Sequence, residues 1–197
     1  MNNNQLIEPF LHIIEHSIVP LTQQAILSGN KIFGAAIIKK SDLSVIIAAT
    51  NAEVENPLWH GEVNAIKKLY ELPPTQRPLP KDCYFLATHE PCSLCLSAIT
   101  WAGFDNIYYL FDYNDSNDVF HIPHDLHILQ AVFHCQQGQY AHHNHYWNSY
   151  HLIELLDGTD APVKQKILKK ALYLRGIYTQ MSNIYQQSKQ PQIIPLP

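Results

Sequence analysis

A chain of 197 residues with 46% hydrophobic and only 15% charged residues can bury a sizeable single-domain core and is too apolar to be disordered. Its formal net charge of -4 and pI of about 6.3 favour a small-molecule substrate, and nucleic acid held mainly through its phosphates is not favoured. No run reaches membrane-spanning length and no signal-peptide pattern opens the chain, so we expect a cytoplasmic protein with no membrane partner.

The first part of the chain alternates between helical and extended patterns. Apolar residues recur at helical spacing over residues 6–28, where Pro20 is expected to kink or split the helix. Two strands, residues 31–38 and 44–49, follow with a turn between them, and we expect them to be buried on both faces. After a loop, residues 62–72 again carry a helical pattern.

Beyond a proline-rich linker at residues 73–81, the pattern continues as strand, helix and strand. Residues 82–88 predict a strand, and a helix runs from Cys92 to about Ala102, with Gly103 as its stop. Residues 107–111 predict the next strand. Helices and strands in this order predict a mixed sheet sandwiched by helices.

The last third of the chain carries a weaker pattern. Residues 126–133 predict a helix, residues 136–148 a polar, His-rich loop, and residues 163–187 a long amphipathic helix. We expect residues 1–135 to form the core and residues 136–197 to add a helical extension to the same domain. The aliphatic and aromatic face of the last helix favours a homodimer.

Two short motifs dominate the chemistry, His60-x-Glu62 and Pro91-Cys92-x-x-Cys95. Two cysteines three positions apart on the first turn of a helix place both sulfurs on one face, and one imidazole from another element adds a third ligand. Three protein ligands with an open fourth position are the layout of a catalytic zinc site. His60, Cys92 and Cys95 are therefore the predicted Zn²⁺ ligands, and Glu62 is the predicted catalytic proton carrier.

Together these motifs resemble the cytidine deaminase-like superfamily over residues 34–111, and within it the guanine deaminase and tRNA adenosine deaminase branch. Residues 33–37 (Phe-Gly-Ala-Ala-Ile), Asn51, residues 90–95 and residues 99–102 (Ile-Thr-Trp-Ala) carry the closer likeness. The resemblance implies an α/β fold, a three-layer sandwich whose mixed five-stranded sheet is flanked by helices, here with a C-terminal helical extension. Residues 1–135 would then be the deaminase core.

The resemblance also implies an activity, the hydrolytic deamination of a nucleobase or nucleoside by zinc-bound hydroxide, with Glu62 as proton shuttle. Purines (guanine, guanosine or adenosine) are favoured as substrates. By the same resemblance Asn51 would hydrogen-bond the base, and Phe33 or Trp101 would pack on its face. The chain departs from the family at Gly61, where alanine or valine is usual.

Several alternatives stay open at this stage. The chain could be a tRNA-editing adenosine deaminase, a cytidine or deoxycytidylate deaminase, or an inactive zinc-binding module. The metal could instead be structural, with Cys83, His89 or a later histidine as a fourth ligand. Seven histidines between residues 121 and 145 are expected to be solvent-exposed or hydrogen-bonded and not a second metal site (His121, His124, His127, His134, His142, His143 and His145).

Overall fold

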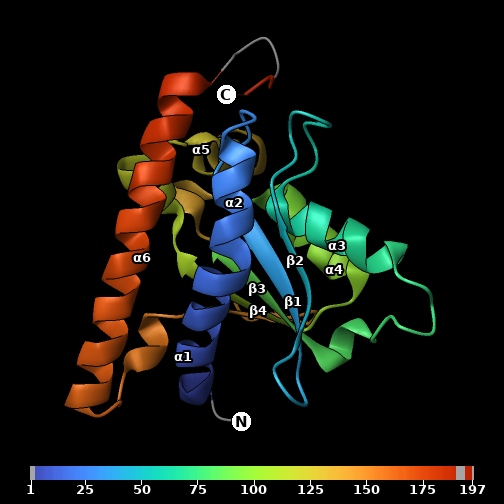
Figure 1. The fold of residues 1–197 in the computed structure, drawn as a ribbon, viewed down its shortest axis with the longest axis vertical. Helices are drawn as coiled ribbons and strands as arrows, with labels where there is room; N and C mark the ends of the chain where they lie inside the picture. The colour runs from blue at the N-terminus through green and yellow to red at the C-terminus, as the bar shows by residue number, and fades with distance from the viewer. Residues whose placement is uncertain (1–2, 190–193, 197) are drawn as a thin grey trace.

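A five-stranded mixed sheet forms the middle layer of the computed structural model, which describes residues 3–189 and 194–196 (Figure 1). The strand order is β2-β1-β3-β4-β5, in which β1 is antiparallel to β2 and β3 while β3, β4 and β5 are parallel. The strands are β1 Gly34–Lys39, β2 Val45–Thr50, β3 Cys83–His89, β4 Asn106–Phe111 and β5 Asn148–His151.

Helices cover both faces of this sheet. The helices α1, α2 and α6 lie on one face, and α3 and α4 lie on the other (Figure 1). The helices are α1 Asn3–Ile13, α2 Val19–Ile26, α3 Gly61–Glu71, α4 Ser93–Ala102, α5 His124–Phe133 and α6 Ala161–Ser188. The three-layer α/β sandwich implied by the sequence is confirmed.

Strand β1 shows how the sequence builds two cores from one sheet. Successive side chains of a strand point to opposite faces. Ala35 and Ile37 therefore pack in the core under α3 and α4, while Ala36 and Ile38 pack in the core under α1, α2 and α6. Because β1 is covered on both faces, it reads in the sequence as a continuous apolar run.

The neighbouring strand β2 corrects one expectation. It was predicted to be buried on both faces, but it lies at the edge of the sheet and most of its residues are half-exposed, with Ala49 the buried exception. An apolar run alone does not distinguish an edge strand from a central one, because the number of neighbouring strands is set by the topology.

The N-terminal helical segment is divided as Pro20 suggested. A π-helical turn at Ile14–Ile18 separates α1 from α2, and Pro20 lies in the first turn of α2. Proline has no backbone N–H to donate, so the carbonyl four residues before Pro20 lacks its α-helical partner. The regular α-helix is therefore interrupted here.

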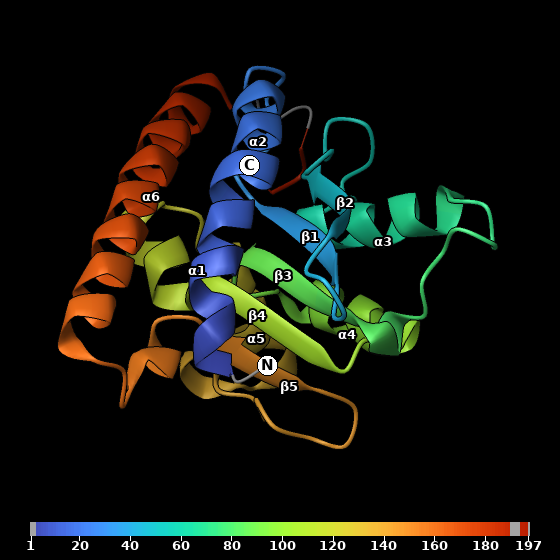
Figure 2. The same ribbon diagram turned by 60° about the horizontal axis from the view of Figure 1, so that its bottom comes forward.

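The fifth strand comes from the C-terminal part of the chain. β5 pairs in parallel with β4 and forms the edge of the sheet opposite β2 (Figure 2). The segment predicted as a helical extension, residues 136–197, therefore supplies a strand as well as the long helix α6, and the boundary at residue 135 stays a prediction. None of the described helices has the length and apolar character needed to cross a membrane.

Gly61 lets α3 approach the sheet closely, and Gly34 lets the π-helical turn approach it from the other face. A Cβ atom on Gly61 would lie 2.7 Å from the Cα of Gly34 and 3.0 Å from the carbonyl oxygen of Phe33. A Cβ atom on Gly34 would in turn lie 2.4 Å from Cγ2 of Ile18. The departure from the family at Gly61 therefore has a packing reason, because the first turn of α3 rests directly on the backbone of β1.

We predict that Gly61→Ala lowers the free energy of unfolding by about 1–3 kcal/mol, because the added methyl group has only backbone to displace. Urea unfolding of the two proteins measures the difference. Gly176→Ala in α6 is the matched control, since nothing lies within 4 Å of a Cβ there, and it should raise the stability by about 0.5–1 kcal/mol. Equal effects of both substitutions would contradict the close contact at Gly61.

Candidate metal centre

The site is built where two helices begin. His60 is the N-cap residue of α3 and Cys92 is the N-cap residue of α4, both with extended backbone angles. The carbonyl of His60 accepts the N–H of Asn64, and the carbonyl of Cys92 accepts the N–H of Leu96, each at 2.8 Å. The positive ends of two helix dipoles thus meet at one place, where they favour anionic groups such as thiolates.

The three predicted ligands come together in the fold. Nδ1 of His60 lies 3.5 Å from Sγ of Cys92 and 3.7 Å from Sγ of Cys95, and the two sulfurs are 3.5 Å apart. A tetrahedral zinc ion with ordinary Zn–S and Zn–N bonds requires donor atoms about 3.6–3.8 Å apart. The donor set and its spacing therefore fit Zn²⁺ with little rearrangement.

The electrostatics of the cluster favour a charged sulfur. Hydrogen bonding with Cys95 and with His60 holds the pKa of the Cys92 thiol well below its usual range, against the opposing effect of burial. Burial would lower the pKa of His60, but the hydrogen bond to Cys92 and its charge outweigh burial and raise it to about 9. These interactions stabilise a thiolate beside an imidazolium, and a bound metal ion would take the place of the imidazolium proton.

Glu62 lies beside the three ligands. Its Oε2 accepts a hydrogen bond from the thiol of Cys95 at 3.3 Å, and the residue is buried. Burial, followed by the charge of Cys92, raises the pKa of Glu62 to about 7. A carboxyl group with a pKa near neutrality can both accept and donate a proton, which is what general acid-base catalysis requires.

A buried polar network, which the sequence did not indicate, supports His60 from behind. Lys31 and Glu53 form an ion pair of 2.7 Å with both side chains almost fully buried, and Oε1 of Glu53 lies 3.8 Å from Nε2 of His60. A carboxylate behind a ligating imidazole orients the ring and raises its basicity. Neither residue stands out in the sequence, because polar residues such as Asn30 and Glu55 lie close to them, and the sequence did not show that Lys31 and Glu53 meet.

Asn51 belongs to the same network. Its Oδ1 accepts the backbone N–H of Gly61 at 2.5 Å, and its Nδ2 donates to Oε2 of Glu53 at 2.6 Å. Asn51 thus links the start of α3 to the ion pair. Each of its two polar atoms retains capacity for one more hydrogen bond, so its predicted contact with a base stays a prediction.

The two aromatic residues predicted to contact substrate lie in different environments. Phe33 is buried, with its ring centroid 4.7 Å from that of His89. Trp101 is 92% exposed, and it lies six residues beyond Cys95 on α4, about 9 Å further along the helix. Trp101 therefore lies on the outer surface of this chain, and its role at the substrate, like that of Phe33, stays a prediction.

Asp125 is a second carboxyl group near the cluster that the sequence did not single out. It lies in the first turn of α5 and is buried. Burial raises the pKa of Asp125 well above its usual range, and the charges of Cys92 and Glu62 raise it further. Its proximity depends on how α5 returns to the sheet, for which the local sequence gave no signal.

No fourth protein ligand completes the cluster in the part of the chain that the structure describes. His60, Cys92 and Cys95 are grouped there without Cys83 or His89. Cys83 is buried in the core under α3 and α4, and His89 is enclosed by aromatic rings. Three ligands with an open position match the catalytic form of a zinc site.

Comparison with known proteins agrees with this geometry. Residues 15–111 match the family described as the cytidine and deoxycytidylate deaminase zinc-binding region, and the match contains both motifs. This chain belongs to the cytidine deaminase-like superfamily. The matched region is a zinc-binding one, which confirms Zn²⁺ as the expected cofactor.

Two curated proteins are similar in sequence to part of this chain. Guanine deaminase of Bacillus subtilis (strain 168) is 33% identical over 86 residues, which are 43% of this chain and 53% of the relative. A probable cytosine deaminase of Schizosaccharomyces pombe is 29% identical over 103 residues, 52% of this chain and 60% of the relative. The chain thus spans little more than half the length of these relatives.

A solved structure shows a similar fold over a longer stretch. Guanine deaminase from Nitrosomonas europaea superposes with a TM-score of 0.50 at 16% identity, covering 81% of each chain. At this identity the likeness concerns the fold alone.

His89 is the last residue of β3, the strand that leads to Cys92, and its ring is enclosed by other rings. Its Nδ1 is hydrogen-bonded to Oγ1 of Thr88 at 2.9 Å, while its Nε2 is buried without a hydrogen-bond partner. Burial and the charge of Arg175 lower the pKa of His89 to about 3. The surrounding rings are those of Phe33, Phe111, Phe120 and Tyr178.

We predict that this histidine makes the fold sensitive to acid. Its pKa in the folded state is depressed, so its neutral form contributes stability above pH 6.5 that is lost progressively as the pH falls toward 3. At pH 5 the loss should be about 2 kcal/mol. Urea unfolding at pH 7.5 and pH 5 of the wild type and of His89→Phe measures it, and an equal loss in both proteins would contradict the prediction.

Proposed function

We propose that this chain is a zinc-dependent hydrolase that removes an amine from a nucleobase or nucleoside, with a purine as substrate and guanine or guanosine first among the purines. The observation that carries the proposal is the buried carboxyl group of Glu62 next to a three-ligand His60, Cys92 and Cys95 cluster. A structural zinc site needs neither the open fourth position nor a proton carrier.

The reaction consumes one water and releases one ammonia. Zinc held by the three ligands would lower the pKa of a bound water, so that it can act as a nucleophile near neutral pH. Glu62 would accept a proton from the attacking water and deliver it to the ring nitrogen as the C–O bond forms. Glu62 then carries the second water proton to the amine, the C–N bond breaks, and the ring keeps a carbonyl in place of the amine.

Two observations support a purine. The relative from Bacillus subtilis that matches the motif region is a guanine deaminase. Asp125 also places a second buried carboxyl group within electrostatic reach of Glu62 and Cys92. A carboxyl group accepts hydrogen bonds from N–H groups and, when protonated, donates one to a ring nitrogen, so it suits the N–C–N edge of an aminopurine.

The direct test is ammonia release by the zinc-loaded protein. We expect release from guanine or guanosine, in a panel with adenine, adenosine, cytosine, cytidine and deoxycytidylate. Glu62→Gln should bind zinc normally and lose at least about a hundredfold in kcat, the usual contribution of a general acid-base group. Full activity in Glu62→Gln would contradict the mechanism.

If the zinc-loaded protein releases ammonia from none of these compounds, the proposal of a small-molecule purine substrate is contradicted. The same protein would then be assayed on tRNA, where inosine formation would identify the tRNA-editing alternative. If no inosine forms in tRNA either, the result would favour an inactive zinc-binding module. The expected homodimer and cytoplasmic location stay predictions.

We predict that Asp125→Asn lowers kcat/KM for the purine by about tenfold to a hundredfold, because the amide presents an N–H2 group where a carboxyl oxygen would accept a hydrogen bond from the purine edge. Zinc content and the free energy of unfolding should change little, which separates a substrate contact from a structural role. His127→Asn is the matched control on the same helix. An unchanged kcat/KM in Asp125→Asn would place the substrate elsewhere.

A further inference from the structure

A second group of metal-binding side chains lies on the opposite face of the sheet from the site described above. His12 is near the end of α1, and Glu15 and His16 follow in the π-helical turn. The three residues form the sequence His12-x-x-Glu15-His16, in which positions three and four residues apart lie on one side of the helix.

The donor atoms of these residues are close together. One ligand atom from each of the three lies within 4.8 Å of the others. The rings of His12 and His16 have centroids 4.3 Å apart, and Nε2 of His16 lies 2.9 Å from Oε2 of Glu15. Both histidines are exposed, so their rings can rotate to close the spacing to the roughly 3.5 Å that bonds of about 2.1 Å require.

The chemistry of this donor set is specific. Two imidazoles and one carboxylate suit borderline divalent ions such as Zn²⁺, Co²⁺ and Ni²⁺, and the absence of sulfur distinguishes the set from the His60 cluster. The hydrogen bond from Lys170 holds the pKa of Glu15 below its usual value against the opposing effect of burial, and the charges of Lys170, His16 and His12 lower it further. The carboxylate is therefore ready to act as a ligand.

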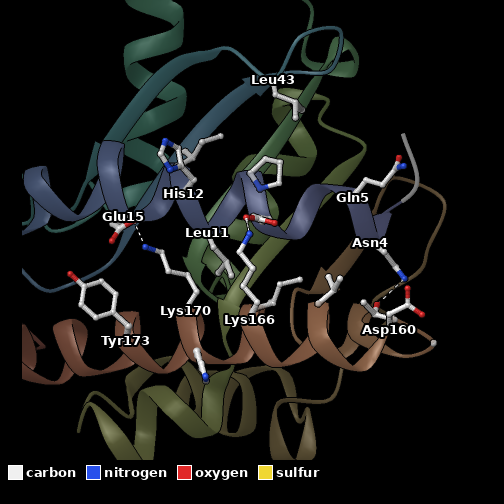
Figure 3. A pocket seen from close by; sticks show the side chains of 18 residues that line it. Asn4, Gln5, Leu11, His12, Glu15, Leu43, Asp160, Lys166, Lys170 and Tyr173 are labelled. Carbon is white, nitrogen blue, oxygen red and sulfur yellow. Dashed lines mark hydrogen bonds and ion pairs between the residues drawn. The ribbon is translucent and has the colours of Figure 1, made fainter.

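The surroundings leave room for an ion and its remaining ligands. His12 and Glu15 line a cavity of about 1310 Å³ between α1 and α6, and Figure 3 shows Glu15 directed at Lys170 of α6. Lys166 pairs with Glu8 one turn further along, so two ion pairs join the helices across the cavity. An ion at Glu15 would compete with Lys170 for the carboxylate.

We propose that His12, Glu15 and His16 form a second site for a divalent transition-metal ion, independent of the His60, Cys92 and Cys95 cluster. Binding exchanges the Glu15–Lys170 ion pair between α1 and α6 for metal ligation. His12 and Glu15 line the cavity, from which water or an anionic ligand would complete the coordination.

Cobalt titration of the full chain tests the site. The thiolate cluster is first filled with one equivalent of Zn²⁺, and Co²⁺ is then added while spectrum and bound metal are measured. We expect one further equivalent of Co²⁺ without the near-ultraviolet thiolate-to-cobalt band that replacement of zinc would produce. In His12→Asn/His16→Asn the affinity should fall at least about tenfold, since even outer-shell partners contribute that much.

Two variants sharpen the test. His143→Asn/His145→Asn also removes two exposed histidines but leaves the cluster intact, so it should bind Co²⁺ as the wild type does. Lys170→Met should tighten binding severalfold, because it removes the competitor for Glu15. No additional equivalent, or an equal affinity in His12→Asn/His16→Asn, would overturn the site. Unchanged or weaker binding in Lys170→Met would overturn Glu15 as its third ligand.

Discussion

The constraint on which the structure depends is the convergence of two helix N-termini. α3 begins at His60 and α4 begins at Cys92, and the donor atoms they carry are held 3.5–3.7 Å apart. This spacing survives because α3 rests on the backbone of β1 through Gly61 and Gly34. A small displacement of either helix would change the donor distances by more than a zinc site tolerates.

A buried network of charged and polar residues lies next to the ligands. Its internal hydrogen bonds offset the free-energy cost of removing its charged groups from water. Lys31 and Glu53 are removed from water together, and Glu53 also accepts from Asn51. A buried ion pair contributes little net stability, but removing one partner leaves an uncompensated charge and costs several kcal/mol. Its value here is positional, because Glu53 faces His60 while Asn51 holds the N–H of Gly61.

The C-terminal third completes the fold on both sides of the sheet. β5 extends the sheet beside β4, and α6 packs Leu174 and Tyr178 into the core shared with α1 and α2. α5 brings Asp125 toward the ligands. The family match ends at residue 111, so the three ligands and Glu62 lie within the matched region and Asp125 lies beyond it.

The sequence by itself predicted the His60, Cys92 and Cys95 cluster, the carboxyl group of Glu62 beside it, and most of the helices and strands. These follow from spacing within short segments, as in Cys92 and Cys95 one helical turn apart. Only the tertiary structure decided that β2 is an edge strand, that Trp101 lies on the surface and that Asp125 approaches the cluster. Such features depend on contacts between segments distant in sequence, and local hydrophobic periodicity does not predict those contacts.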